Sequence, residues 1–263
     1  MARLSTLAVG LALITAVAPL AVVALASFLR PGQYYLPPDP PSADGYAKAV
    51  ELGMPQALAN SALVGLLAAA ISIAVSLPTA YATAKLGFSP RLFLAVVILT
   101  ALARSVPPSA LLVAVYEAVR GLGLLDSHLG LALAYQIYTL PMALWIMMAF
   151  AYEINPEVEA AARVDGATPL RRMLHIAIPA MRNGILAVAA LTVIEVWGEY
   201  LYAAVLINAP SKFTASVLIG QLVSSEYGFD WGVVSAASVL ASIPPLLMVG
   251  IATRAMTKIH LGK

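Results

Sequence analysis

Residues 156–170 read PEVEAAARVDGATPL and interrupt a very apolar sequence. A helix is expected to begin at Pro156, because proline suits the first helical position, and the three alanines after Glu159 favour its continuation. Gly166 predicts the end of that helix, and Pro169 predicts the start of a second one that runs to about Ile178. The stretch therefore predicts two short helices joined at a glycine corner.

The composition of the whole chain is typical of a membrane protein. Of its 263 residues, 61% are hydrophobic and only 11% are charged, whereas an ordinary soluble domain carries about 25% charged residues. A net charge of +2 is too small to indicate nucleic acid as a partner, and the absence of cysteine excludes disulfides and thiolate metal sites. The three histidines are too scattered along the chain to give a metal-ligand spacing.

Charged residues mark where the chain leaves the lipid, and a crossing helix needs about 20 apolar residues. On this basis the sequence predicts an all-α membrane protein, a six-transmembrane-helix bundle. The predicted spans are residues 4–29, 60–83, 92–116, 129–152, 183–207 and 231–253.

The first predicted span is expected to be a retained helix. No residue between Arg3 and Arg30 is charged, and this stretch is longer than the roughly 7–15 apolar residues of a signal peptide. Residues 1–55 are thus predicted to hold the first transmembrane helix and an external loop rich in proline and glycine, with a short helix near 45–52. Residues 56–263 are predicted to form the transmembrane core, with a cytoplasmic loop at 154–182.

Lysine and arginine favour the cytoplasmic side of a membrane, and they are unevenly spread over the predicted loops. The set of segments that holds both termini and the 154–182 loop carries ten, and the other set carries four. This asymmetry predicts a multi-pass protein with both termini in the cytoplasm. The ten are Arg3, Lys85, Arg91, Arg163, Arg171, Arg172, Arg182, Arg254, Lys258 and Lys263, and the four are Arg30, Lys48, Arg120 and Lys212.

The 154–182 loop is the longest predicted cytoplasmic loop, and its alanines give the first helix a smooth surface that a partner protein could approach closely. Glu159, Arg163 and Asp165 could fix the register of such a partner through charge pairs. A connector that lies on the membrane surface, with Arg171 and Arg172 on lipid phosphates, explains the loop equally well. A DNA-binding helix-turn-helix is disfavoured, because about 28 residues tethered at both ends cannot form the required domain.

The segment EAAARVDGA (159–167), followed by Ile176 and Pro179, resembles the cytoplasmic loop of permease subunits of binding-protein-dependent ABC importers. Further motifs resemble the carbohydrate, or maltose-type, branch of that family and cover about residues 55–210. These motifs are NSAL (60–63), AYATAKLGF (80–88), GLGLLDSHLGLALAY (121–135), LPMALW (140–145) and WGEYLYA (197–203). Two positions depart from the family pattern, since Ala160 replaces the motif glutamate and Gly198 replaces a usual asparagine.

The resemblance implies that this loop is a coupling helix between transmembrane helices 4 and 5 that contacts an ATPase. The residues it implies for this contact are Glu159, Ala160, Ala161, Ala162, Arg163, Asp165 and Gly166. It also implies a second homologous permease subunit, an ABC ATPase dimer, an external solute-binding protein, and a sugar or oligosaccharide as the transported substrate. The chain would then be a transport subunit of the cell membrane and not an enzyme.

No phosphate-binding Gly-x-x-x-x-Gly-Lys-Ser/Thr motif occurs in the chain. The sequence therefore predicts no cofactor in this chain, and the resemblance implies that ATP and Mg are bound by the partner ATPase.

Three charged residues, Arg104, Glu195 and Glu199, interrupt predicted spans. A charge at the bilayer centre costs about 2.5–3.5 kcal/mol on insertion scales, so such residues usually face a cavity or a partner. One hypothesis is that they line a translocation path together with Trp197 and Tyr200, since carboxylates and aromatic faces suit sugars. The other is that Arg104 pairs with Glu195 or Glu199 and only holds the helices together.

Two other functions stay open at this point. A secondary transporter or channel could use Glu195 and Glu199 as a proton or cation site. A membrane anchor or assembly factor would need no translocation path at all.

Overall fold

The computed structural model describes residues 2–86, 90–224 and 230–260, and within these ranges the regular structure is entirely helical. Single 3-10 turns follow α4 and α12, and a π-helical turn at Met173–Ala177 follows α9. The helices are α1 (Ala2–Ala26), α2 (Asp44–Glu51), α3 (Met54–Lys85), α4 (Pro90–Ser105), α5 (Leu112–Gly121), α6 (His128–Ala134), α7 (Gln136–Glu153), α8 (Pro156–Val164), α9 (Pro169–Arg172), α10 (Ile178–Ala180), α11 (Arg182–Trp197), α12 (Leu201–Leu206), α13 (Ala215–Val223) and α14 (Trp231–His260).

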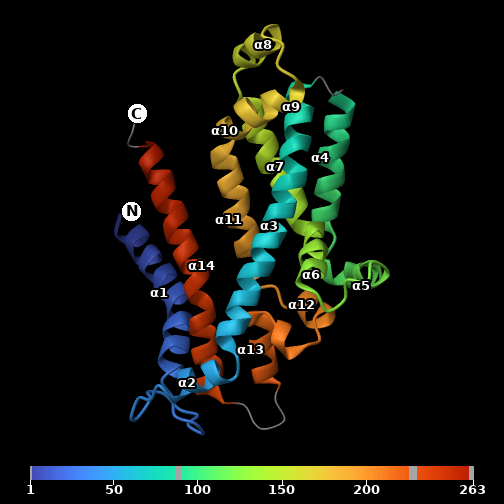
Figure 1. The fold of residues 1–263 in the computed structure, drawn as a ribbon. Helices are drawn as coiled ribbons and strands as arrows, with labels where there is room; N and C mark the ends of the chain where they lie inside the picture. Colours follow the sequence, from blue (N-terminus) through green and yellow to red (C-terminus); the bar gives the residue numbers. More distant parts are fainter. Residues whose placement is uncertain (1, 87–89, 225–229, 261–263) are drawn as a thin grey trace.

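The long helices form a bundle with α3 at its centre. This helix packs along α7 and α11 and also meets α6 and α13. The short helices α8, α9 and α10 lie at one end of the bundle, and α2 and α13 lie at the other (Figure 1). The first residues of α1 and the last residues of α14 point towards the end that carries α8 (Figure 1).

Small residues bring the central helices close together. Ala80 on α3, Ala143 and Ala151 on α7 are fully buried where these helices pack. Gly184 on α11 lies against the ring of Phe150 on α7, so that a Cβ at this position would come within 2.6 Å of the ring. Such residues are favoured where helices associate in lipid, because they let two backbones approach.

Among the described residues, two helices are long and apolar enough to cross a membrane, Met54–Lys85 and the Trp231–Met248 part of α14. Two pairs of helices pass the same test if each is taken as one bent span. The first pair is α6 with α7, bent by 58°, and the second is Pro169–Ala180 with α11, bent by 72°.

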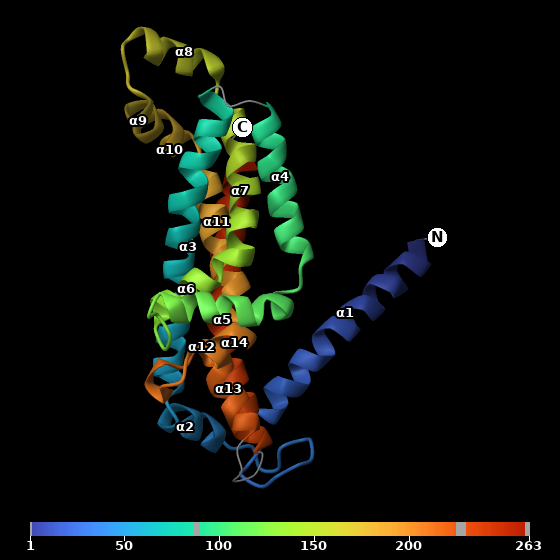
Figure 2. The same cartoon turned by 90° about the vertical axis from the view of Figure 1, so that its right-hand side faces the viewer.

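The predicted span over 92–116 does not extend to residue 116 in the structure. Helix α4 ends at Ser105, a 3-10 turn follows at Pro108–Leu111, and α5 then runs across the bundle (Figure 2). Pro108 has no N–H to donate, and it disfavours the helical conformation in the residue before it. Pro107 accordingly has a ψ of 133°.

The other predicted boundaries are closer to the structure. Helix α2 confirms the short helix predicted near 45–52. The predicted span 183–207 divides into α11 and α12, since α11 ends at Trp197 before Gly198. The predicted start of the core at residue 56 falls inside α3, which begins at Met54.

Helix α1 leans away from the rest of the bundle (Figure 2). The C-terminal end of α1 meets α14. Its residues 13–25 are exposed, including the large apolar side chains of Leu13, Ile14, Leu20 and Leu25. An apolar face of this kind suits contact with lipid tails.

Candidate functional site

Helix α8 forms as the sequence predicts. It begins at Pro156, and the Asn155 side chain caps it by accepting a hydrogen bond from the backbone N–H of Glu157 at 2.8 Å. Gly166 has a φ of +75°, the left-handed conformation that ends many helices. The following helical segment runs past its predicted end at Ile178, because the π-helical turn leads into α10, which contains Pro179 in its first turn.

The outer face of α8 carries little charge. Ala160 and Ala161 are exposed, and Val164 has 89% of its surface exposed. Glu157 extends this face by one turn, since it lies three residues before Ala160 on the helix. The helix therefore presents small and apolar side chains outward, at the end of the bundle where α8 projects furthest (Figure 1).

Glu159 lies on the opposite side of the helix and is buried, with only 2% of its surface exposed. Its Oε2 atom is 2.7 Å from the guanidinium of Arg172 on α9, which is itself 5% exposed. The hydroxyl of Tyr81 on α3 donates to the same carboxylate, at 3.0 Å from Oε1 and 3.2 Å from Oε2. The structure thus places Glu159 inside the chain, apart from the exposed alanines.

The other predicted coupling residues lie around the buried Glu159 carboxylate. Arg163 donates a hydrogen bond to the backbone carbonyl of Lys85, at the end of α3. Ala162 is half-buried, and Asp165 and Gly166 are exposed at the corner.

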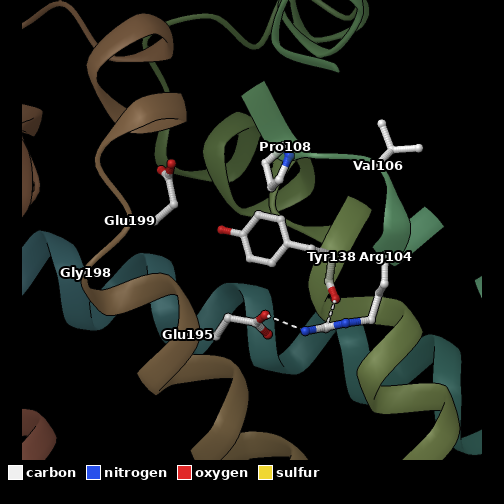
Figure 3. A pocket seen from close by; sticks show the side chains of 7 residues that line it. All are labelled: Arg104, Val106, Pro108, Tyr138, Glu195, Gly198 and Glu199. Atoms are coloured by element: carbon white, nitrogen blue, oxygen red, sulfur yellow. Dashed lines mark hydrogen bonds and ion pairs between the residues drawn. The ribbon is translucent and has the colours of Figure 1, made fainter. Parts of the chain in front are cut away.

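A cavity of about 350 Å³ lies where α4, α7 and α11 come together, and several of its lining residues, among them Arg104 and Val106, are exposed. It contains three of the five residues predicted for a translocation path (Figure 3). Its lining residues are Arg104, Val106, Pro108, Tyr138, Glu195, Gly198 and Glu199.

Arg104 and Glu195 form one of the two ion pairs that the sequence offers as alternatives. The guanidinium of Arg104 is 3.3 Å from Glu195 Oε1 and also donates to the backbone carbonyl of Tyr138 at 2.9 Å (Figure 3). Glu195 Oε2 and the hydroxyl of Tyr138 have no hydrogen-bond partner within the described part of the chain. Two polar atoms beside the cavity therefore retain unused hydrogen-bonding capacity.

Glu199 is engaged by hydrogen bonds of a different kind. Its carboxylate accepts from the backbone N–H groups of Tyr202 at 3.0 Å and Ala203 at 3.3 Å, at the start of α12. It also accepts from the hydroxyl of Tyr135 at 2.8 Å. The carboxylate thus caps α12 while it lines the cavity.

The two aromatic residues predicted for the path lie elsewhere. Trp197 is 8% exposed and donates to the backbone carbonyl of Ala241 at 2.9 Å, which joins α11 to α14. Tyr200 is half-exposed and packs against Gly220. Tyr138, which does line the cavity, was not predicted, because a single tyrosine in an apolar segment gives no signal of its own.

A polar cluster ties the loops together at the other end of the bundle. Asp126 accepts hydrogen bonds from the backbone N–H groups of Asn208 at 2.9 Å and Ala209 at 3.0 Å, and its carboxylate is 2.9 Å from Lys212 Nζ. The bond from Ala209, then Lys212 and Asn208, lower the pKa of Asp126 from 3.8 to about 2. This carboxylate therefore stays ionised at any ordinary pH.

Residues 72–258 match the sequence profile of the binding-protein-dependent transport system inner membrane component. A sulfoquinovosyl glycerol transport system permease protein of Agrobacterium fabrum, SmoH, is 33% identical over 193 residues, which cover 73% of this chain and 66% of that protein. A trehalose transport system permease protein of Mycobacterium tuberculosis, SugB, is 31% identical over 195 residues, or 73% of this chain and 70% of that protein.

The fold also has a counterpart among solved structures. A chain in the crystal structure of a bacterial ABC transporter involved in the import of the acidic polysaccharide alginate superimposes with a TM-score of 0.81. The match covers 96% of this chain and 95% of the other, at 20% sequence identity. At that identity the likeness concerns the fold.

Proposed function

Because this chain belongs to the binding-protein-dependent ABC transporter permeases, we propose that it passes a sugar or an oligosaccharide into the cell. Members of this family are multi-pass proteins of the inner membrane. The chain is a permease component and not itself an enzyme, and the family implies a complex with a separate ATPase and a binding protein.

The observation that carries the proposal is the geometry of α8. Its outward face of Ala160, Ala161 and Val164 is small and apolar, with one charged residue, Glu157, a turn earlier, while its inner face is fixed to the bundle through Glu159. A groove on an ATPase subunit would contact these small apolar side chains with little desolvation of polar groups, which keeps the cost of docking low. Movement of the ATPase would then pass directly into the bundle.

Within this proposal the predicted coupling residues have different tasks. Ala160 and Ala161 make the contact surface together with Val164, the half-buried Ala162 lies at its edge, and Asp165 and Gly166 form the corner beside it. Glu159 holds the helix from its buried side, and the exposed Arg163 ties it to the end of α3.

The proposed path passes through the cavity between α4, α7 and α11. Carboxylates, a guanidinium and a tyrosine hydroxyl accept and donate hydrogen bonds, as hydroxyl groups of a sugar require. The free capacity of Glu195 Oε2 and the Tyr138 hydroxyl would be filled by such groups when the cavity opens. The relatives named for trehalose and sulfoquinovosyl glycerol support a carbohydrate as the substrate.

The proposal includes six membrane crossings, with both termini and α8 in the cytoplasm. The crossings would be α1, α3, α4, α7 with α6, α11 and α14. A second homologous permease would complete the path, and an ATPase dimer would bind ATP and Mg.

The alternative of an ion-driven transporter has weaker support. Glu195 is paired with Arg104, and Glu199 is held by two N–H groups and a hydroxyl. Two carboxylates that already have such partners offer a poor site for a proton or a metal cation.

The test is reconstitution. The chain is co-expressed with an ATPase, a second permease and a binding protein from the same organism, and uptake of radiolabelled trehalose and maltose into proteoliposomes is measured with and without ATP. ATP-dependent uptake that requires the binding protein supports the proposal. Uptake by this chain alone, driven by a proton gradient without ATP, would refute it.

A further inference from the structure

We propose that Glu159 is a positioning residue for transport: with Arg172 and Tyr81 it forms an internal strut that fixes α8 to α3. The strut would carry the movement of the ATPase into α3, so this inference rests on the proposed function. It differs from the role that the family resemblance implies for Glu159, which is direct contact with the ATPase.

Burial is the first argument. Glu159 and Tyr81 are each 2% exposed and Arg172 is 5% exposed, so the rest of the chain shields the ion pair from solvent. Each of the three residues belongs to a different helix, α8, α3 and α9. A buried carboxylate is tolerated when it is paired and hydrogen-bonded, and breaking the pair leaves an uncompensated charge. The helices are therefore expected to move together.

Two more hydrogen bonds hold the same corner. Arg163 donates to the Lys85 carbonyl at 3.0 Å, and Lys85 Nζ donates to the Ile154 carbonyl at 2.8 Å. The last carbonyls of a helix lack intrahelical partners and lie at the negative end of the helix dipole. A cation at the end of α3 can therefore donate a hydrogen bond to such a carbonyl and is also favoured by the dipole. These bonds fasten Ile154, just before α8, and the last turn of α8 to the end of α3.

The far end of α3 is fastened as well. The Asn60 side chain donates to the carbonyls of Ser211 at 3.0 Å and Phe213 at 2.9 Å. The Ser61 hydroxyl accepts from the backbone N–H of Ala215 at 2.9 Å. A helix of 32 residues is about 48 Å long at about 1.5 Å per residue. Helix α3 thus links the α8 corner to the loop before α13 at the opposite end of the bundle.

The test uses Glu159→Gln, which keeps the size of the side chain and removes its charge. Glu117→Gln, which changes an exposed carboxylate on α5 away from α8, is the control, and Tyr81→Phe is a milder second variant. Hydrogen exchange of residues 155–166 is measured for the full chain in lipid nanodiscs. In the reconstituted complex, the amount of bound ATPase and the stimulation of ATP hydrolysis by the binding protein with trehalose or maltose are measured.

In Glu159→Gln we expect exchange in α8 to rise at least tenfold and stimulation to fall at least fivefold, with the ATPase still bound. Tyr81→Phe should show the same changes to a smaller extent, and Glu117→Gln should stay within twofold of the unmodified chain. Unchanged exchange in Glu159→Gln would overturn the strut, whether or not the ATPase stays bound. If Glu159→Gln does not fold, Tyr81→Phe decides by the same criteria. Hydrogen exchange needs no transport, so it tests the strut even if the proposed function fails.

Discussion

Arg104 on α4 and Glu195 on α11 meet beside the cavity, with 3.3 Å between the guanidinium and the carboxylate. The same guanidinium donates to the Tyr138 carbonyl on α7, so one side chain joins three helices (Figure 3). The side chains of Arg104 and Glu195 are 34% and 27% exposed, and a pair that remains this accessible contributes less to stability than a buried one. Its position therefore favours a role in the path over a purely structural one.

Replacing Glu195 by Gln tests this role. We expect uptake to fall about tenfold, because a hydrogen bond to a charged group contributes about 1.5–3 kcal/mol. The amide oxygen of Gln still accepts from Arg104, so the complex should assemble in normal amounts. Uptake and the yield of purified complex are measured together. Lower yield with normal uptake per complex would show that the pair is only structural.

Glu199 is expected to matter more for stability. Glu199→Ala removes the cap of α12 and the acceptor of the Tyr135 hydroxyl. Loss of a helix cap costs about 1–2 kcal/mol, so the thermal midpoint in detergent should fall by several degrees. Glu117→Ala, which breaks an exposed pair with Arg120 on α5, is the control and should change it little. Equal midpoints for both variants would contradict the capping role.

The contact between α7 and α11 should not tolerate a side chain at Gly184. In Gly184→Ala the new Cβ would come within 2.6 Å of the Phe150 ring, and overpacking of this kind costs about 1–3 kcal/mol. Gly121→Ala is the matched control, since nothing lies within 4 Å of its Cβ position. Thermal unfolding in detergent compares the two. A Gly184→Ala protein as stable as Gly121→Ala would mean that the helices pack less closely.

The Asp126 cluster predicts a dependence of stability on acid pH. The pKa of Asp126 is about 2 in the folded chain, against an ordinary value of 3.8 for an aspartate. The folded state therefore binds the proton less tightly than the unfolded state. The stabilisation is then complete above about pH 4 and is lost as pH falls through about 2. Asp126→Asn should flatten the fall of the thermal midpoint in this range. Asn tolerates the positive φ of 52° at this residue, so the variant changes the charge and not the backbone.

Local signals in the sequence predicted the α8 corner well. Proline at a first helical position, alanines and a glycine at the end act over a few residues, and the tertiary structure does not override them here. The inward direction of Glu159 could not be predicted, because its partners Arg172 and Tyr81 lie 13 and 78 residues away.

The cavity was predicted only in part, for the same reason. A charge inside an apolar span is visible in a sequence, which is why Arg104, Glu195 and Glu199 were found. The capping of α12 by Glu199 depends on how the chain turns after Gly198, and the position of Tyr138 depends on the packing of α7 against α4. The break after Ser105 was underestimated because paired prolines are tolerated inside some spans.

The contact between α8 and an ATPase is tested most directly by crosslinking. The chain has no cysteine, so Ala161→Cys can be labelled alone with a thiol-reactive photocrosslinker, and Val50→Cys on α2 serves as the control at the other end of the bundle. In a complex shown to transport, we predict that Ala161→Cys captures the ATPase subunit and Val50→Cys does not. An active complex in which Ala161→Cys never captures the ATPase would contradict the account.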